Sequence, residues 1–147
     1  AEKYQMPIIY SVHPRSKKWI EKRGFKFHPL VKQLKPFGFF DYCKLQKEAY
    51  CVLSDSGTLS EETAILNFPG VLIRTSTERP EALDAGTVVV GGVKTKDVEQ
   101  ALELAVSLRN EVVPMSKDYE STKVSTKVVK IIQSYTNIVN LTTWGKK

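Results

Sequence analysis

A short stretch near the middle of the chain, residues 54–62 (SDSGTLSEE), combines residue types that can hold a phosphate group. It follows an apolar segment of strand length, residues 50–53, and a helical segment opens at Thr58. Ser56 and Gly57 therefore lie in a strand-to-helix turn. In such a turn the backbone N–H groups and the positive end of the helix dipole favour a bound anion. We expect this turn to be a phosphate site.

Two charged side chains from the flanking sequence can converge on the same turn. Glu62 lies one turn into the expected helix, and Arg79 lies in the loop TERPE, residues 77–81, after the next apolar segment. A carboxylate can accept hydrogen bonds from a ribose diol, and a cation can face a diphosphate. The arrangement is typical of half of a nucleotide-sugar site.

The elements that must position these residues alternate between strand and helix. Strands are predicted over residues 7–12, 31–34, 50–53, 71–74 and 87–90. Helices are predicted over residues 16–23, 41–48, 58–66, 95–108 and 122–135. Strands rich in Val, Ile and Leu that alternate with helices indicate a parallel sheet covered on both faces. The predicted fold class is therefore α/β, with a Rossmann-like parallel sheet flanked by helices.

Local signals mark the ends of three helices. Gly24 is a typical C′ residue for the first helix. Asp41 can cap the second helix, and Thr58 and Glu61 have the spacing of a capping box at the start of the third.

The last two helices each carry an apolar stripe, which is typical of a helix that faces a core. In the first of them the stripe consists of Val98, Ala101, Leu102, Ala105 and Leu108. In the second it consists of Val124, Val128, Ile131, Ile132 and Tyr135.

Polar residues follow three of the predicted strands. His13 ends the first strand, Ser56 and Gly57 follow the third, and Arg74 and Arg79 follow the fourth. All of them would lie at the carboxyl ends of parallel strands, the edge where open α/β sheets bind ligands. This shared edge supports a binding site more strongly than any one motif does.

Each candidate also has a purely structural interpretation. His13 could form a hydrogen bond to a loop carbonyl, Ser56 and Gly57 could form only a tight turn, and Tyr42 could simply pack in the protein. Glu62 could be a solvated carboxylate in the first turn of its helix. Arg79 could form a surface ion pair with Glu78, Glu81 or Asp84. The second histidine, His28, is expected to be structural or exposed.

The composition is that of an ordinary globular protein and argues against nucleic-acid binding. A chain of 147 residues with 41% hydrophobic and 26% charged residues is typical of a single soluble globular domain. Its net charge of +6 is spread along the chain. The one basic cluster, residues 15–23, also fits the solvated face of a short helix. Nucleic-acid binding is therefore not expected.

The two cysteines, Cys43 and Cys51, form neither a CxxC metal motif nor a disulfide framework, which favours a reducing compartment. The sequence shows no signal peptide and no apolar run near 18 residues, so we expect a cytoplasmic protein without membrane contact or bound metal. Because residue 1 is Ala and not Met, we expect the chain to be part of something larger.

Over about residues 7–132 the chain resembles the C-terminal half of the non-hydrolysing UDP-N-acetylglucosamine 2-epimerases. The specific motifs are SDSG at residues 54–57, Glu61-Glu62, and TERPE-x₃-AGT ending at Thr87. The resemblance implies that residues 1–147 are a single UDP-binding domain, the C-terminal lobe of a two-lobed GT-B-type fold. The N-terminal lobe would then be absent from this chain.

The resemblance also implies roles for individual residues on the phosphate side of the site. Ser56, Gly57 and the N–H of Thr58 would hold the UDP diphosphate. Arg79 would lie against the nucleotide charge near the sugar, and His13 would contact phosphate and support the departure of UDP.

On the nucleoside side the resemblance implies three contacts. Glu62 would accept hydrogen bonds from the ribose hydroxyls. Tyr42 would lie beside the uracil ring, and backbone near Phe37 would read the uracil edge.

The reaction implied is inversion at C2 of a UDP-N-acetylhexosamine. A base removes the C2 proton while UDP leaves C1, and reprotonation on the other face and return of UDP complete the inversion. Neither a metal nor another cofactor is needed. The family draws its acid–base carboxylates from the N-terminal lobe, so we expect this chain to bind UDP weakly and not to epimerise alone. The family is commonly dimeric.

Two departures from the usual family pattern bear on the sugar. Pro14-Arg15-Ser16-Lys17 replaces a run rich in Arg, Glu and Asn, and Gly57-Thr58 replaces Gly-Gly. Both resemble the branch that forms UDP-N-acetyl-L-fucosamine for capsule or O-antigen, and the parent reaction stays open.

Other functions also remain open for this sequence. The chain could be the donor lobe of a UDP-sugar glycosyltransferase, or a nucleotide-binding module without chemistry. The tail 136–147, with Trp144 as its one large apolar anchor, could pack on the missing lobe or be a frayed end.

Overall fold

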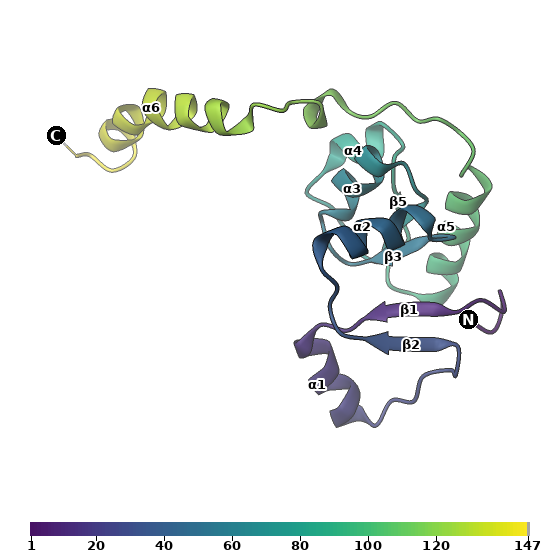
Figure 1. Cartoon of the computed structure of the whole chain (residues 1–147). Coiled ribbons are helices and arrows are strands. Elements are labelled where there is room, and N and C mark those ends of the chain that lie inside the picture. Colours follow the sequence, from purple (N-terminus) through teal and green to yellow (C-terminus); the bar gives the residue numbers. More distant parts are fainter. Residues whose placement is uncertain (147) are drawn as a thin grey trace. The chain divides into compact units, whose positions relative to one another are not determined.

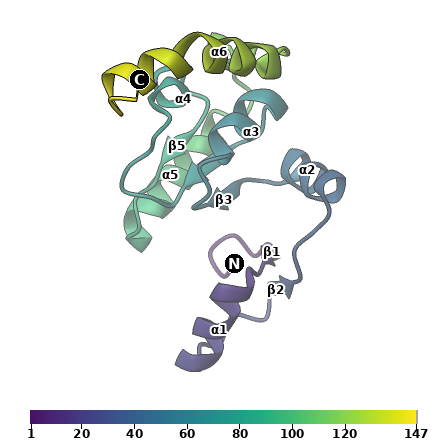
Figure 2. The ribbon, with the colours of Figure 1, turned by 90° about the vertical axis from the view of Figure 1, so that its left-hand side faces the viewer.

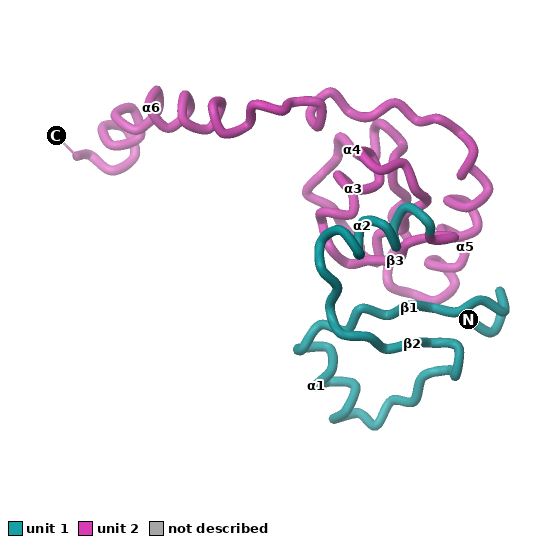
Figure 3. Tube along the Cα trace, viewed as in Figure 1, with its two compact units in different colours: residues 1–48 teal, residues 49–147 magenta. Residues whose placement is uncertain are grey.

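A computed structural model describes residues 1–146, and its short parallel strands alternate with helices (Figure 1). The chain divides into two compact units (Figure 3), unit 1 with residues Ala1–Glu48 and unit 2 with residues Ala49–Lys147. Every strand pair in the described residues is parallel. The predicted α/β class, with parallel strands and flanking helices, is confirmed.

Unit 1 consists of β1 (Ile8–Ser11), α1 (Pro14–Arg23), β2 (Val31–Leu34) and α2 (Phe39–Glu48). Helix α1 connects β1 to β2, and the two strands pair with Ile8 opposite Val31. Both ends of α1 follow from local sequence. The His13 side chain accepts a hydrogen bond from the Arg15 N–H, and Pro14 suits the first helical position. The helix ends at Gly24 with φ +59°, so this predicted C′ glycine is confirmed.

Unit 2 holds the remaining elements, with its strands in the order β3-β4-β5. Its elements are β3 (Val52–Ser54), α3 (Leu59–Leu66), β4 (Gly70–Leu72), α4 (Pro80–Asp84), β5 (Val89–Val90), α5 (Thr95–Ser107), the 3₁₀ helix η1 (Lys117–Tyr119) and α6 (Val124–Thr142). Figure 2 shows α3, α4 and α5 grouped around these strands.

The core of unit 2 lies on both faces of β4. Leu72 packs in a cluster with Leu59 of α3 and Ala82 of α4, whereas its neighbour Val71 packs with residues of α5. Because successive strand residues point to opposite faces, helices cover this strand on both sides. The rest of these clusters comprises Phe68, Val88, Ala101 and Ala105. The predicted α5 stripe is therefore buried at its centre, while Leu108 at its end is 41% exposed.

Helix α3 approaches β4 closely because residue 70 is a glycine. A Cβ at Gly70 would overlap the Thr63 methyl group and would lie 3.6 Å from the Leu59 side chain. This contact holds the first turn of α3 against the strand and so positions the preceding loop.

The predicted capping box at the start of α3 does not form. Thr58 has helical backbone angles, φ −66° and ψ −15°, and its side chain makes no cap hydrogen bond. Glu61 reaches the Arg79 guanidinium instead. A charge-assisted hydrogen bond is stronger than a neutral one, so the arginine outcompetes the backbone for this carboxylate.

Helix α6 begins two residues later than predicted and extends through Thr142. Its apolar stripe shares one face, yet no residue within its described span 124–142 is buried. The stripe residues Val124, Val128, Ile131, Ile132 and Tyr135 are 46–58% exposed. Across residues 1–146, no helix has the length and apolar character needed to span a membrane.

Candidate functional site

The loop between β3 and α3, residues 55–58, is a compact turn held by its own hydroxyl groups. The Ser56 N–H donates to Ser54 Oγ at 3.0 Å, and the Ser56 and Thr58 hydroxyls lie 2.9 Å apart. The Leu59 N–H donates to the Ser56 carbonyl at 3.2 Å, which starts the helix. Local side-chain hydrogen bonds of this kind are typical of Ser and Thr in turns.

The start of α3 presents hydrogen-bond donors that the protein does not use. Within residues 1–146, neither the Gly57 N–H nor the Thr58 N–H has an acceptor. Ser56 and Thr58 are exposed, and Gly57 between them is half-buried, so the turn lies at the surface of unit 2. Unused N–H groups and the positive helix end together favour an anion.

Two guanidinium groups approach the same turn from the loop after β4. A Cβ at Gly57 would lie 3.1 Å from Arg79 Nη1 and 3.6 Å from Arg74 Nη1. Glycine at this position therefore lets both cations come close to the backbone. Of the predicted site residues, the structure brings Ser56, Gly57, Thr58 and Arg79 together, and with them Arg74, which was expected at the same edge of the sheet.

Arg74 is engaged by its own carboxylate partner. Its Nη1 and Nη2 donate to the two oxygens of Glu78 at 2.7 and 2.9 Å. This bidentate hydrogen bond lowers the pKa of Glu78 from 4.5 to about 2, and it raises the pKa of Arg74. Both terminal nitrogens of Arg74 are thus occupied, so Arg74 is the less available of the two cations.

Arg79 is held differently. Its Nε donates to Glu61 Oε1 at 2.5 Å, and its Nη1 lies 3.9 Å from Glu78. The hydrogen bond to Glu61 raises the pKa of Arg79. The side chains of Arg79 and Glu61 are each 31% exposed. Of the structural partners expected for Arg79, Glu78 is near, whereas the main partner, Glu61, was not predicted because its spacing suggested a helix cap.

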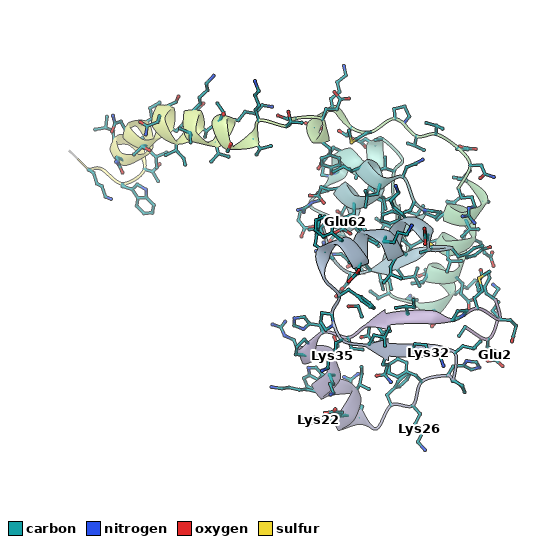
Figure 4. The ribbon with its side chains drawn as sticks, viewed as in Figure 1. Glu2, Lys22, Lys26, Lys32, Lys35 and Glu62 are labelled. Carbon is teal, nitrogen blue, oxygen red and sulfur yellow. The ribbon has the colours of Figure 1, made fainter. Side chains whose placement is uncertain are left out.

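The positive charge at this turn is a local feature. Residues 49–147 contain 11 Lys and Arg against 12 Asp and Glu, whereas residues 1–48 contain 11 against four. Figure 4 labels four of the unit 1 lysines: Lys22, Lys26, Lys32 and Lys35. Unit 2 therefore has no general excess of cations, and an anion at the turn depends on Arg74, Arg79 and the backbone donors.

Glu62 lies on α3 (Figure 4), and it follows Glu61 in the sequence of that helix. Its N–H donates to the Thr58 carbonyl at 2.9 Å, and its side chain is half-buried. Because neighbouring residues on an α-helix point about 100° apart, Glu61 and Glu62 have different surroundings. Glu61 binds the Arg79 guanidinium, and Glu62, the next residue, lies about 100° further around the helix.

Unit 1 carries the other three predicted site residues. His13 is exposed, and its Nδ1 accepts the Arg15 N–H at 3.2 Å. A neutral imidazole that accepts at Nδ1 carries its proton on Nε2. Tyr42 lies in the first turn of α2, where its N–H donates to the Gly38 carbonyl at 3.0 Å, and Phe37 precedes that helix as a half-buried residue.

Tyr119, which the sequence did not single out, connects a distant segment to the Arg79 loop. Its hydroxyl donates to Glu81 Oε1 at 2.8 Å, and its ring packs against the core cluster that contains Leu59 and Ala82. Burial and this hydrogen bond raise the pKa of Tyr119. Glu81 is in the first turn of α4, so this bond helps to hold the helix that follows Arg79.

Comparison with known protein families gives a match over nearly the whole chain. The family model described as UDP-N-acetylglucosamine 2-epimerase matches residues 1–133. The UDP-N-acetylglucosamine 2-epimerase of Methanococcus maripaludis is 35% identical over 107 residues, which are 70% of this chain and 29% of that protein. The enzyme of Methanocaldococcus jannaschii is 33% identical over 72% of this chain and 30% of its own length.

Solved structures agree with the sequence match. The UDP-N-acetylglucosamine 2-epimerase from Rickettsia bellii has a TM-score of 0.79 at 39% identity, over 99% of this chain and 41% of that one. The Methanocaldococcus jannaschii enzyme in complex with UDP-GlcNAc and UDP has a TM-score of 0.75 at 30% identity, over 90% of this chain and 37% of that one. This chain therefore spans less than half the length of the proteins that it matches.

Proposed function

Because this chain belongs to the UDP-N-acetylglucosamine 2-epimerase family, we propose that it is the UDP-binding part of such an epimerase. The observation that carries the proposal is the position of Arg79. Its Nη1 lies beside Gly57, where the Gly57 and Thr58 N–H groups have no acceptor within the described residues. A diphosphate needs donors and a cation at one place, and this turn supplies both.

The proposed contacts divide between phosphate and nucleoside. In unit 2 the Ser56 hydroxyl and the Gly57 and Thr58 N–H groups bind the diphosphate, Arg79 faces its charge, and Glu62 accepts hydrogen bonds from the ribose. The ligand of the Methanocaldococcus jannaschii relative, UDP with UDP-GlcNAc, supports a uridine nucleotide as the occupant.

Three residues of unit 1 complete the proposal. His13 has the Nε2 proton directed by its Nδ1 hydrogen bond, so it can donate to a phosphate oxygen and assist UDP as it leaves. Tyr42 lies beside the uracil, and backbone near Phe37 reads the uracil edge. These are the positions that the family resemblance assigns.

The proposed reaction is inversion at C2 of a UDP-N-acetylhexosamine. A carboxylate base takes the C2 proton as the C1–O bond breaks and its electrons leave with UDP. A proton is then added to the opposite face of C2, and UDP returns to C1. The chain spans 29% and 30% of two curated relatives, and we propose that the remaining length, an N-terminal lobe, provides this base. Alone, the 147-residue chain binds UDP and does not epimerise.

Several finer features belong to the same proposal. The substrate is a UDP-N-acetylhexosamine for a surface polysaccharide precursor; the run Pro14-Arg15-Ser16-Lys17 and Gly57-Thr58 favour the branch that forms UDP-N-acetyl-L-fucosamine, and the parent UDP-N-acetylglucosamine reaction is the alternative. The protein works in the cytoplasm, supported by its free cysteines Cys43 and Cys51. The complete protein is a homodimer. The exposed apolar face of α6 suits contact with the N-terminal lobe.

The experiment is a calorimetric titration of UDP into the chain, with Glu62→Ala and Arg79→Ala beside it. Saturable binding at micromolar to low-millimolar UDP, weakened by both substitutions, is the expected result. A folded chain that binds no UDP would contradict the proposal, unless binding returns when the N-terminal lobe is present. With that lobe restored, exchange of the C2 proton in D₂O distinguishes an epimerase from a glycosyltransferase, which would transfer the sugar to an acceptor.

A further inference from the structure

We propose that Glu61 is a positioning residue of the nucleotide site, which holds the Nε edge of the Arg79 guanidinium so that its Nη1 edge faces the phosphate turn. This inference rests on the proposed function for the identity of the ligand. It concerns a carboxylate to which the family resemblance assigned no role. Its basis is the geometry of three residues, Gly57, Glu61 and Arg79.

The first step is how the two edges of Arg79 are used. A guanidinium offers Nε and two terminal nitrogens in one plane. Glu61 Oε1 accepts from Nε at 2.5 Å, and the terminal Nη1 lies 3.1 Å from the position of a Cβ on Gly57. One edge is therefore bound by the protein, and the other lies against the turn that carries unused N–H donors.

The second step is that Arg79 is the main support of this carboxylate. Glu61 Oε2 is buried, and within residues 1–146 it has no hydrogen-bond partner. The Glu61 carboxylate is thus compensated by Arg79, whose other ion pair among the described residues is a longer one, 3.9 Å from Nη1 to Glu78. Loss of Glu61 would leave the arginine side chain free to sample other rotamers, because no other acceptor in the described part of the chain binds Nε.

The third step is the contrast with the neighbouring pair. Glu78 binds both terminal nitrogens of Arg74 and is 61% exposed, whereas Glu61 is 31% exposed and binds only Nε of Arg79, whose Nη1 has a longer contact of 3.9 Å to Glu78. The two carboxylates therefore act differently. Glu78 neutralises an arginine, and Glu61 orients one.

Simple electrostatics predicts the opposite outcome, which makes the idea testable. Glu61 is a negative charge near a site for a negative ligand, so its removal should strengthen UDP binding a few-fold if charge alone mattered. If Glu61 positions Arg79, its removal should weaken UDP binding instead. The sign of the change separates the two.

The test is an NMR titration of the 147-residue chain with UDP and with uridine, for wild type, Glu61→Ala and Glu99→Gln. We expect Glu61→Ala to raise the Kd for UDP about tenfold and to leave the Kd for uridine within twofold. Glu99→Gln removes a carboxylate of exposed Glu99 on α5 and should change neither. If Glu61→Ala weakened the binding of UDP and of uridine by the same factor, the substitution would have damaged the fold in general, and the proposal would fail. Unchanged or tighter UDP binding would also overturn the proposal.

A second measurement needs no ligand. The Arg79 Nε–H proton should give a distinct, slowly exchanging signal in the wild-type chain and should lose that protection in Glu61→Ala. Absence of such a signal in the folded wild type would overturn the proposal as well. Wild type that fails to bind UDP, with the Nε–H signal present, would instead count against the proposed function while leaving the Glu61–Arg79 contact established.

Discussion

Arg79 lies so close to Gly57 that a side chain at residue 57 would displace it. A Cβ there would stand 3.1 Å from Arg79 Nη1, tighter than ordinary van der Waals contact. The glycine is not required for its backbone angles, because its φ is not positive. It is required for the space that the guanidinium occupies beside the turn.

Gly57→Ala should therefore weaken ligand binding without unfolding the chain. The neighbouring atoms are the ends of flexible side chains, which can move aside, so we expect less than about 1 kcal/mol change in the free energy of unfolding. The shifted guanidinium should raise the Kd for UDP about tenfold. Calorimetric titration and urea denaturation measure the two quantities separately.

The matched control is Gly24→Ala in unit 1. Gly24 has φ +59° and no atom within 4 Å of its Cβ position, so alanine there strains the backbone and meets nothing. We expect a loss of about 1 kcal/mol in stability and no change in UDP binding. If Gly57→Ala instead lowered the stability and left the Kd for UDP unchanged, as expected for Gly24→Ala, the site would not lie at this turn.

Much of unit 2 could be predicted because its signals are local. The strand order, the parallel pairing, the turn at Ser56 and Gly57 and the positions of α3, α5 and α6 follow from apolar runs and turn residues, whereas α4 and η1 were not predicted. Strand ends shifted by one or two residues. The exposed face of α6 could not be predicted, since apolar periodicity indicates a face and not what covers it.

The Glu61–Arg79 pair could not be predicted for a different reason. Two residues distant in sequence meet only after α3 has packed on β4, and the glycine at residue 70 sets that packing. The spacing from Thr58 to Glu61 offered a local alternative, a capping box. A tertiary ion pair replaced it because a guanidinium is the stronger donor.

Acid should weaken the pair between Arg74 and Glu78. The hydrogen bond from Arg74 holds the pKa of Glu78 at about 2 in the folded chain, below the usual 4.5. As pH falls, Glu78 is therefore protonated in the unfolded chain before it is protonated in the folded chain. The stabilisation is complete above about pH 5 and is lost between pH 5 and pH 2. Because Glu78 is 61% exposed, the effect on Tm is small.

We expect the Tm of Glu78→Gln to fall less than that of wild type between pH 5 and pH 2.5. Glu99→Gln, which removes an exposed glutamate outside any ion pair of the described residues, should keep the wild-type slope. Identical slopes for wild type and Glu78→Gln would show that the pair does not persist in solution.

Tyr119→Phe tests the hydrogen bond that connects η1 to α4. Phenylalanine keeps the ring in the core cluster and removes the donor to Glu81, so we expect a loss of about 1 kcal/mol in unfolding free energy. Tyr135→Phe, at a side chain 57% exposed on α6, should stay within about 0.5 kcal/mol of wild type. Equal effects of the two substitutions would contradict the role of Tyr119.

The same contact has a pH signature. Burial and Glu81 raise the pKa of Tyr119 above its usual 10.0, so the unfolded chain loses this proton first. The stabilisation is complete below about pH 9 and declines as pH rises through 10. The difference in Tm between wild type and Tyr119→Phe should therefore shrink above pH 10. A constant difference would mean that the hydroxyl acts by some other contact.

Leu72 and Ile131 are aliphatic residues of similar size that should respond differently to truncation. Leu72 is fully buried between α3 and α4, so Leu72→Ala removes packed atoms and leaves a cavity, at a cost of about 2–5 kcal/mol. Ile131 is 58% exposed on α6, and Ile131→Ala should cost less than about 0.5 kcal/mol in the 147-residue chain. If α6 contacts an N-terminal lobe as proposed, Ile131→Ala should become costly only in a protein that contains that lobe. Urea denaturation of both variants, with and without the lobe, measures these losses in unfolding free energy. If Ile131→Ala cost equally little in both proteins, the α6 face would not contact the N-terminal lobe.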